Sequence, residues 1–260
     1  MSTDTCPVCT EVDVIEKVGT YIMEQMTGSN IVDSDMTEQV GQIVQWLTET
    51  TDKDMMEAWG SVCSAVSTRR AEGGVSAEIP QHALSLELLF KAGMKGGPWD
   101  DATFITTCCD KGPTLTLIKT NKGDVFGGYA DVPWKVYTCA IASGGGAFLF
   151  DLQIKGGGQP FKINLSEGMN GNAMGRYTGT PLAFGSGKLA RDEHGSYPEV
   201  SEFALVTQVE QPGMPQLVSN IGSYNIYDKP TEGALYSPDL TSRKFDVAEV
   251  EVYRVHWIQI

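Results

Sequence analysis

Two pairs of cysteines have spacings that could support thiol chemistry. Cys6 and Cys9 form a C-x-x-C pair, a spacing that can lower a thiol pKa or supply half of a zinc site. Cys108 and Cys109 are adjacent and cannot supply the other half, so we expect no metal. We place Cys108 and Cys109 in a cysteine-aspartate turn ahead of a strand, as either a reactive pair or two buried thiols. All four are candidate redox residues.

Two carboxylates near the end of the sequence could do acid and base work. Glu249 and Glu251 alternate with Val250 and Val252, so they share one face of a predicted strand. General acid–base catalysis would require one of them to be buried, because burial raises the pKa of a carboxyl group. A strand that is exposed on one face shows the same alternation. We therefore interpret the pair as the solvated face of an edge strand.

The pair Gly127 and Gly128 raises the possibility of a phosphate cradle. Such cradles use backbone N–H groups at the N-terminus of a helix. No helix signal follows these glycines, and neither G-x-G-x-x-G nor G-x-x-x-x-G-K-[S/T] surrounds them. Glycines within a strand instead permit a bulge or a close contact between backbones. We expect this role for Gly127 and Gly128, and also for Gly185 and Gly187, and we predict no cofactor.

The common catalytic patterns do not occur in the sequence. His82, His194 and His256 lie in unrelated contexts. There is no nucleophile elbow and no H-E-x-x-H helix. A catalytic triad is assembled in space, so the sequence leaves that possibility open. On these patterns we predict that the protein is not an enzyme.

These residues lie in two regions of the sequence that differ in apolar spacing and in glycine and proline content. Residues 10–72 carry apolar residues at helical spacing, which predicts three helices, the second of them capped by Ser34 or Asp35. Beyond residue 72 lie 25 of the 29 glycines and 11 of the 12 prolines, and short alternating runs replace the helical spacing. We predict a helical region, residues 1–80, and a second domain, residues 84–260.

Short strands separated by glycine turns favour an antiparallel sandwich for the second domain. Parallel strands would need long crossover helices, and this part of the sequence has no signal for them. The strongest strand predictions are 114–119, 124–129, 147–154, 160–165, 203–209 and 245–257.

Charge and hydropathy argue against several classes of partner. With 33 acidic and 19 basic residues the formal net charge is -14, which repels nucleic acid and anionic lipid heads. No run of about 18 apolar residues occurs, and the N-terminus lacks a signal-peptide pattern. We expect a cytoplasmic protein without nucleic-acid partners or direct membrane insertion. The negative charge is a better match for a basic surface on a partner protein than for nucleic acid or anionic lipid.

Seven segments resemble, in order, those of the TLDc domain family. The clearest is C-D-K-G-P-T-L-T-L-I-K at 109–119, which is followed by one segment that contains V-F-G-G-Y at 125–129 and P-W at 133–134. The resemblance covers residues from about 84 to 258 and leaves out the helical region. The other segments are L-L-F at 88–90, A-F-L-F-D-L at 147–152, L-A-F-G-S-G-K-L at 182–189, I-G-S-Y at 221–224 and F-D-V-A-E-V-E-V-Y at 245–253.

The resemblance implies an α+β fold class, in which an antiparallel two-sheet β-sandwich with short flanking helices follows the helical region. The family has no established active site, so the resemblance implies none for this chain. Members of the family are linked to resistance to oxidative stress, and several bind the cytosolic sector of the vacuolar proton-pumping ATPase (V-ATPase) and regulate its assembly. The motif residues, for which the resemblance implies structural roles, are Gly112, Pro113, Phe126, Gly127, Gly128, Trp134, Phe184, Gly185, Gly187, Glu249 and Glu251.

Three functional hypotheses follow. The first is a non-catalytic cytosolic protein-interaction module of the TLDc type, whose partner is a set of V-ATPase cytosolic subunits or another large complex, so that it works at the periphery of a membrane-bound complex. The second is a permanent structural subunit of a large assembly, because amphipathic N-terminal helices must bury their apolar faces. The third is a thiol-based redox protein that uses Cys108 and Cys109, or Cys6 and Cys9.

Overall fold

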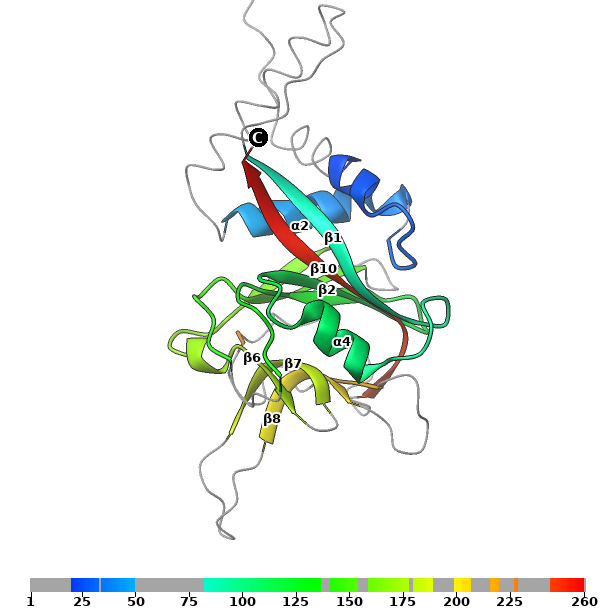
Figure 1. The fold of residues 1–260 in the computed structure, drawn as a ribbon. Helices are drawn as coiled ribbons and strands as arrows, with labels where there is room; N and C mark the ends of the chain where they lie inside the picture. Colours follow the sequence, from blue (N-terminus) through cyan, green and yellow to red (C-terminus); the bar gives the residue numbers. More distant parts are fainter. Residues whose placement is uncertain are drawn as a thin grey trace, which may run out of the picture. The chain divides into compact units, whose positions relative to one another are not determined.

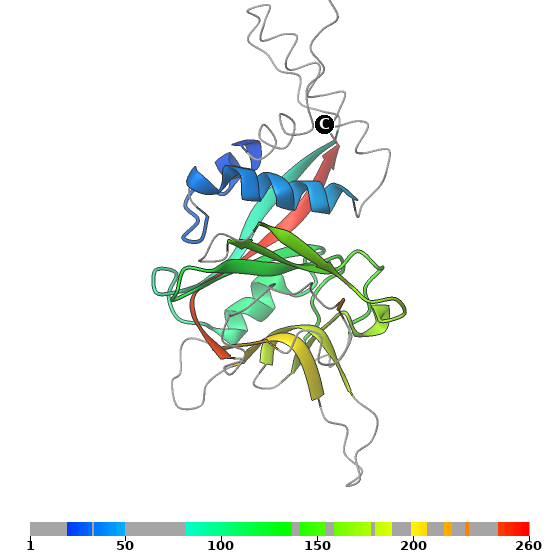
Figure 2. The same ribbon diagram turned by 180° about the vertical axis from the view of Figure 1, so that it is seen from behind.

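Figures 1 and 2 show the fold of the chain in a computed structural model. The structure describes residues 20–32, 34–49, 82–136, 141–153, 159–177, 180–188, 199–206, 216–219, 227–228 and 244–259. The chain forms two compact units. One consists of residues 1–28, 32–86 and 256–260, and the other consists of residues 29–31 and 87–255.

The first unit contains the described helices of the N-terminal region. Residues 20–25 are helical, and a 3-10 turn, η1 (Ser34–Met36), leads into helix α2 (Thr37–Glu49). These elements lie within the spans of the first two predicted helices, while residues 10–19 and the third predicted helix lie outside the described residues. Their apolar stripes are buried: Ile22, Met26, Val40, Ile43, Val44 and Leu47 are each at most 4% exposed.

A side chain in this unit also binds the backbone of strand β1 (His82–Gly93). The Gln25 amide accepts a hydrogen bond from Leu86 N at 2.7 Å and donates one to Leu84 O at 3.3 Å. A neighbouring strand would make the same two kinds of contact with a backbone edge. Because an unpaired edge invites pairing with other chains, these two contacts help to protect the backbone of β1 at Leu84 and Leu86.

The second unit is built around a long antiparallel sheet that is folded into two layers. The strands follow the order β5-β4-β3-β2-β10-β9-β8-β7-β6, and β1 also pairs with β10. The bounds are β2 (Thr114–Thr120), β3 (Val125–Ala130), β4 (Phe148–Gln153), β5 (Phe161–Asn164), β6 (Met174–Tyr177), β7 (Thr180–Lys188), β8 (Glu199–Val206), β9 (Gln216–Ser219) and β10 (Lys244–Gln259), with a 3-10 turn η2 (Asn170–Asn172) before β6.

Strand β10 belongs to both layers. Its residues 244–246 pair with β9, and its residues 247–254 pair with β2. The register shifts between Val247 and Glu249, and a bulge of this kind lets a strand bend from one layer into the other. Every pairing between neighbouring strands in the order from β5 to β6 is antiparallel. The α+β fold class, with an antiparallel sheet and short helices, is therefore confirmed.

Helix α4 (Asp101–Cys108) lies between the two layers, below β2 and above β7 in Figure 1. Asp100 begins the helix as its N-cap and accepts hydrogen bonds from Ala102 N and Thr103 N. No sequence pattern predicted this helix. The predicted cysteine-aspartate turn is wrong for Cys108, which is the last residue of α4, while Cys109 is its C-cap.

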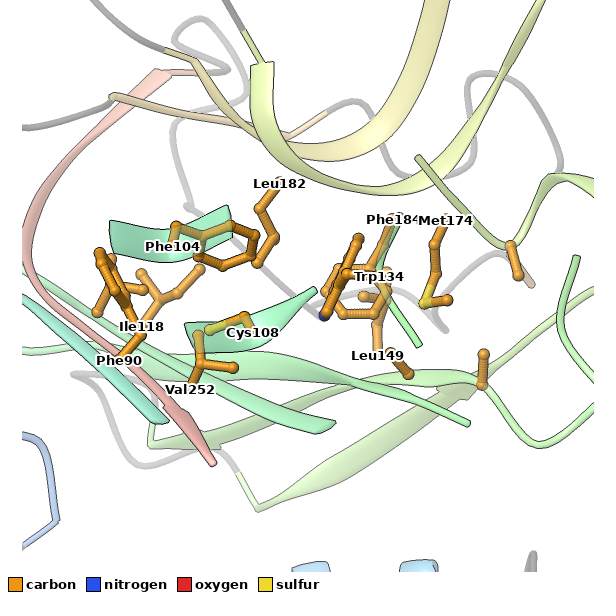
Figure 3. Close-up of a cluster of buried hydrophobic side chains, with 14 of the residues drawn as sticks. Phe90, Phe104, Cys108, Ile118, Trp134, Leu149, Met174, Leu182, Phe184 and Val252 are labelled. Atoms are coloured by element: carbon orange, nitrogen blue, oxygen red, sulfur yellow. The ribbon is translucent and has the colours of Figure 1, made fainter. Parts of the chain in front are cut away.

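Aromatic side chains from both layers and from α4 form the centre of the core, much of which Figure 3 shows. Phe104 of α4 stacks on Trp99 at 5.2 Å between ring centroids and meets Phe90 of β1 edge-on at 5.5 Å. Trp134 meets Phe184 of β7 edge-on at 5.4 Å. Because the chain of rings passes from one layer to the other, its packing ties the layers together.

Candidate functional site

The two carboxylates of β10 are buried, which corrects the sequence-based interpretation. Glu249 is 4% exposed and Glu251 is 0% exposed. Their neighbours Val250 and Val252 point into the core on the other face of the strand. The prediction of a solvated edge strand is wrong because β10 pairs with β2 along one side and with β1 and β9 as well. Alternation marks two faces of a strand, and here both are covered.

Glu251 accepts hydrogen bonds from four donors. Oε2 accepts from the Ser29 hydroxyl at 2.6 Å and from the Tyr253 hydroxyl at 2.8 Å. Oε1 accepts from Asn30 N at 2.7 Å and lies 3.2 Å from Lys91 Nζ. A carboxylate has about four lone-pair positions, so these donors occupy its accepting capacity. Burial, followed by the charge of Glu251, raises the pKa of Tyr253, which keeps the phenol as a donor.

Glu249 holds two segments of backbone at the same place. Its Oε1 accepts from Lys95 N at 2.8 Å, in the turn after β1, and its Oε2 accepts from the Asn30 side-chain amide at 3.3 Å. Gly93 makes the close approach possible, because a Cβ there would lie 2.4 Å from Glu249 Oε2 and the residue has φ +146°. Both carboxylates thus act as acceptors for the fold.

The adjacent thiols lie in the core and are not paired with each other. Cys108 is 0% exposed and Cys109 is 7% exposed, and neither forms a disulfide. Burial raises the pKa of the Cys108 thiol to about 12 and also raises the pKa of Cys109. A reactive cysteine needs access and a lowered pKa. The structure gives this pair neither property, and Cys6 and Cys9 lie outside the described residues.

The glycines of β3 permit close contacts across the sheet. A Cβ at Gly127 would lie 1.8 Å from Thr116 O of β2, and one at Gly128 would lie 2.6 Å from the Phe184 ring of β7. Neither glycine precedes a helix, because β3 runs antiparallel between β2 and β4. These glycines therefore serve sheet packing through close contact, and the register between β2 and β3 is regular across them.

The other motif residues also have structural positions. The Trp134 indole donates to the Thr114 hydroxyl at 2.8 Å, and both residues are fully buried. Pro113 O accepts from Val255 N at 2.9 Å. Gly112 and Gly185 have φ +94° and φ +64°, a conformation that suits glycine. Phe126 and Phe184 belong to the core cluster, and Gly187 pairs with Val200 across β7 and β8.

Two polar elements escaped sequence analysis. Arg176 of β6 is 1% exposed, binds the Asp101 carboxylate at 2.8 Å and lies over the Phe104 ring at 5.4 Å. The strand that contains Arg176 was not predicted, and a single arginine in a sequence does not indicate a buried ion pair. Ser29 and Asn30 were assigned no role from the sequence, although serine and asparagine are residues that form hydrogen bonds in turns.

Within the described ranges, no group of three or more histidine, cysteine, aspartate or glutamate side chains is arranged to hold a metal ion. Among the helices described above, none has the length and apolar character needed to cross a membrane.

Comparison with known proteins agrees with this architecture. The family model described as the TLDc domain matches residues 75–256, which is well over half of the chain. No curated protein matches the chain significantly. Five of the segments that resemble the family include parts of the strands β2, β3, β4, β7 and β10, and L-L-F lies in β1. The segment I-G-S-Y at 221–224 lies outside the described residues. The chain belongs to the TLDc domain family.

Proposed function

We propose that this chain is a non-catalytic protein-interaction module of the TLDc type. The observation that carries the proposal is that the best candidates for chemistry among the described residues are used by the fold itself. Glu251 has four donors on its carboxylate, and Cys108 is buried with a raised pKa. An acid–base or thiol mechanism would require these groups to reach a substrate.

Charge supports a protein partner with a basic surface. The formal net charge of -14 disfavours nucleic acid and anionic lipid, and it speeds encounter with a positively charged protein surface. The resemblance to family members that regulate the V-ATPase suggests its cytosolic subunits as the partner. On this proposal the protein works in the cytoplasm, at the periphery of a membrane-bound complex, and contributes to resistance to oxidative stress.

The turn after β1 is a place to probe such an interaction. Met94 is 81% exposed, and Leu88 and Val136 are the other large apolar side chains exposed among the described residues. The backbone around Met94 is well held: Gly93 N donates to Gly97 O at 2.6 Å, and Met94 N donates to Ala248 O at 2.9 Å. A fixed turn that presents an exposed side chain loses little conformational entropy on binding.

The test is recovery of the full chain from its own cells under mild detergent, followed by size separation and mass spectrometry of co-migrating proteins. Recovery with V-ATPase cytosolic subunits is expected. Met94→Ser is expected to reduce that recovery, while Lys122→Ser, in the exposed turn between β2 and β3, serves as the matched control. Migration of the native protein as a lone chain, with no associated complex, would count against an interaction module.

No specific observation favours the two alternative functions. The apolar stripes that suggested a permanent subunit are already buried within this chain, since Val40 and Leu47 are each 1% exposed. The thiol hypothesis requires accessible cysteines, and Cys108 and Cys109 are buried. Recovery of the protein in fixed stoichiometry with an unrelated complex would revive the first alternative.

A further inference from the structure

A short segment of the N-terminal region belongs to the sandwich unit. Residues 29–31 are part of this unit, although the residues before them, 1–28, and after them, 32–86, belong to the other. The family model begins only at residue 75. Something in the sandwich therefore holds three residues that lie far outside the matched region.

The contacts that hold the segment are mainly polar. The Ser29 hydroxyl and Asn30 N both donate to Glu251, at 2.6 and 2.7 Å. The Asn30 side-chain amide donates to Glu249 at 3.3 Å, and Lys119 Nζ donates to Ile31 O at 3.5 Å. The turn is internally braced, because Ile31 N donates to the Ser29 hydroxyl oxygen at 3.1 Å. Ile31 itself is 0% exposed.

The carboxylates need these donors. A buried carboxylate that lacks hydrogen bonds is strongly unfavourable. From the strands, Glu251 receives the Tyr253 hydroxyl and the Lys91 ammonium group, and Glu249 receives Lys95 N from the turn. The remaining donors to both carboxylates come from Ser29 and Asn30. Among the described residues, the strands thus form an acceptor site that Ser29 and Asn30 complete.

We propose that Glu249, Glu251 and Lys91 form a recognition site for a polar turn and that residues 29–31 are its resident ligand. The site selects a serine hydroxyl, the next backbone N–H and an asparagine amide, which are all uncharged donors. An anionic group would meet two carboxylates and be rejected. The sandwich of this chain is accordingly a discontinuous domain, and residues 29–31 form a latch that completes it.

The test is residue-resolved hydrogen–deuterium exchange on the full chain. Ser29→Ala removes the hydroxyl that links Glu251 and Ile31 N, and Glu251→Gln removes the charge while keeping the shape. Thr27→Ala is the matched control, because the Thr27 hydroxyl donates locally to Glu24 O and is exposed. We expect the amides of Asn30 and Ile31 to exchange roughly 10- to 100-fold faster in both latch variants, as follows from the strength of hydrogen bonds to charged groups.

The amides of β2 and β3 serve as the reference for overall folding. Unchanged exchange in these strands, together with faster exchange at residues 30 and 31, supports the latch. If Ser29→Ala and Glu251→Gln leave residues 30 and 31 as protected as Thr27→Ala does, the proposal is wrong. If Glu251→Gln loosens the whole sheet, Ser29→Ala decides alone, since the Ser29 side chain is only half-buried and its loss leaves the carboxylate with three donors.

Discussion

Replacing Gly128 with alanine tests whether the paired glycines serve packing. A Cβ at this position would lie 2.6, 2.7 and 2.8 Å from three atoms of the Phe184 ring. Ordinary contact begins at 3.4 Å, so the ring has to move by about 0.8 Å, the difference between 3.4 and 2.6 Å. Phe184 is 0% exposed and packs against Trp134, which leaves no free space for this movement.

The expected cost follows from overpacking in a dense core, about 1–3 kcal/mol of unfolding free energy. For a chain of this size each kcal/mol corresponds to about 2–4 °C in melting temperature, so we expect a decrease of about 2–12 °C. The sign of the change in unfolding free energy tests the packing role. Alanine restricts the unfolded chain, so at an open, compatible position it would stabilise the protein by about 0.4–1 kcal/mol. Gly171, which has nothing within 4 Å of its Cβ position, is such a position.

The assay is chemical denaturation of Gly128→Ala, Gly171→Ala, Phe184→Leu and the double variant Gly128→Ala with Phe184→Leu. Phe184→Leu removes ring atoms that the new methyl group would meet, so we expect the double variant to be less destabilised than the sum of the single variants by at least about 0.5 kcal/mol. A Gly128→Ala protein as stable as the parent, or a fully additive double variant, would refute the packing role.

Three further predictions concern the thiols, the core and helix α4. In the native protein at neutral pH, Cys108 and Cys109 should resist iodoacetamide and react only after denaturation, because burial raises the pKa of both; rapid site-resolved labelling of native Cys108 would contradict its burial. Trp134→Phe removes the hydrogen bond to Thr114 and should cost about 1–3 kcal/mol in urea denaturation, whereas Thr114→Ser, which keeps the hydroxyl, should cost less. The Thr103 hydroxyl and N–H lower the pKa of Asp100, so the stabilisation from this cap is present above about pH 4 and is lost as the pH falls through the lowered pKa. The difference in unfolding free energy between the parent and Asp100→Ala should therefore shrink in that range. Asp100→Asn, which caps the helix without ionising, should show no such pH dependence.

Local periodicity was sufficient to locate the strands with the strongest alternation. The prediction 114–119 ends one residue before β2 does, and the prediction 124–129 is displaced from β3 by one residue. The segments 147–154 and 160–165 correspond to β4 and β5, and 245–257 corresponds to β10. The segment 203–209 overlaps β8 (Glu199–Val206) at residues 203–206, and its residues 207–209 lie outside the described residues. Hydrophobic periodicity fixes the existence of an element better than its ends.

Helix α4 escaped detection for a physical reason. Its sequence, D-A-T-F-I-T-T-C, is short and rich in β-branched residues, which have low helix propensity. The helix forms because Asp100 caps it and because Phe104 and Cys108 are buried between the layers. Tertiary packing therefore overrides the local preference. The misplacement of Cys108 in a turn followed directly from the missing helix.

The carboxylate pair shows what alternation along one strand cannot decide. Glu249 and Glu251 share a face, as predicted, but whether that face meets water depends on residues elsewhere in the chain. The Ser29 hydroxyl that binds Glu251 is 222 residues away in sequence. Acidic residues in alternation with valine are thus compatible with both a solvated edge and a buried acceptor site, and only the long-range contact distinguishes them.

This distinction also bears on where function should be sought. The carboxylates and the thiols drew attention because catalysis uses the same residue types, yet in the described residues they serve the interior of the domain. A partner of the proposed interaction module would instead bind groups that the core does not need. Met94, with an exposed side chain on a backbone held by Ala248 and by its neighbours Gly93 and Gly97, is a group of that kind. Loss of partner binding on substitution of Met94, with stability unchanged, would separate the recognition surface from the architecture that supports it.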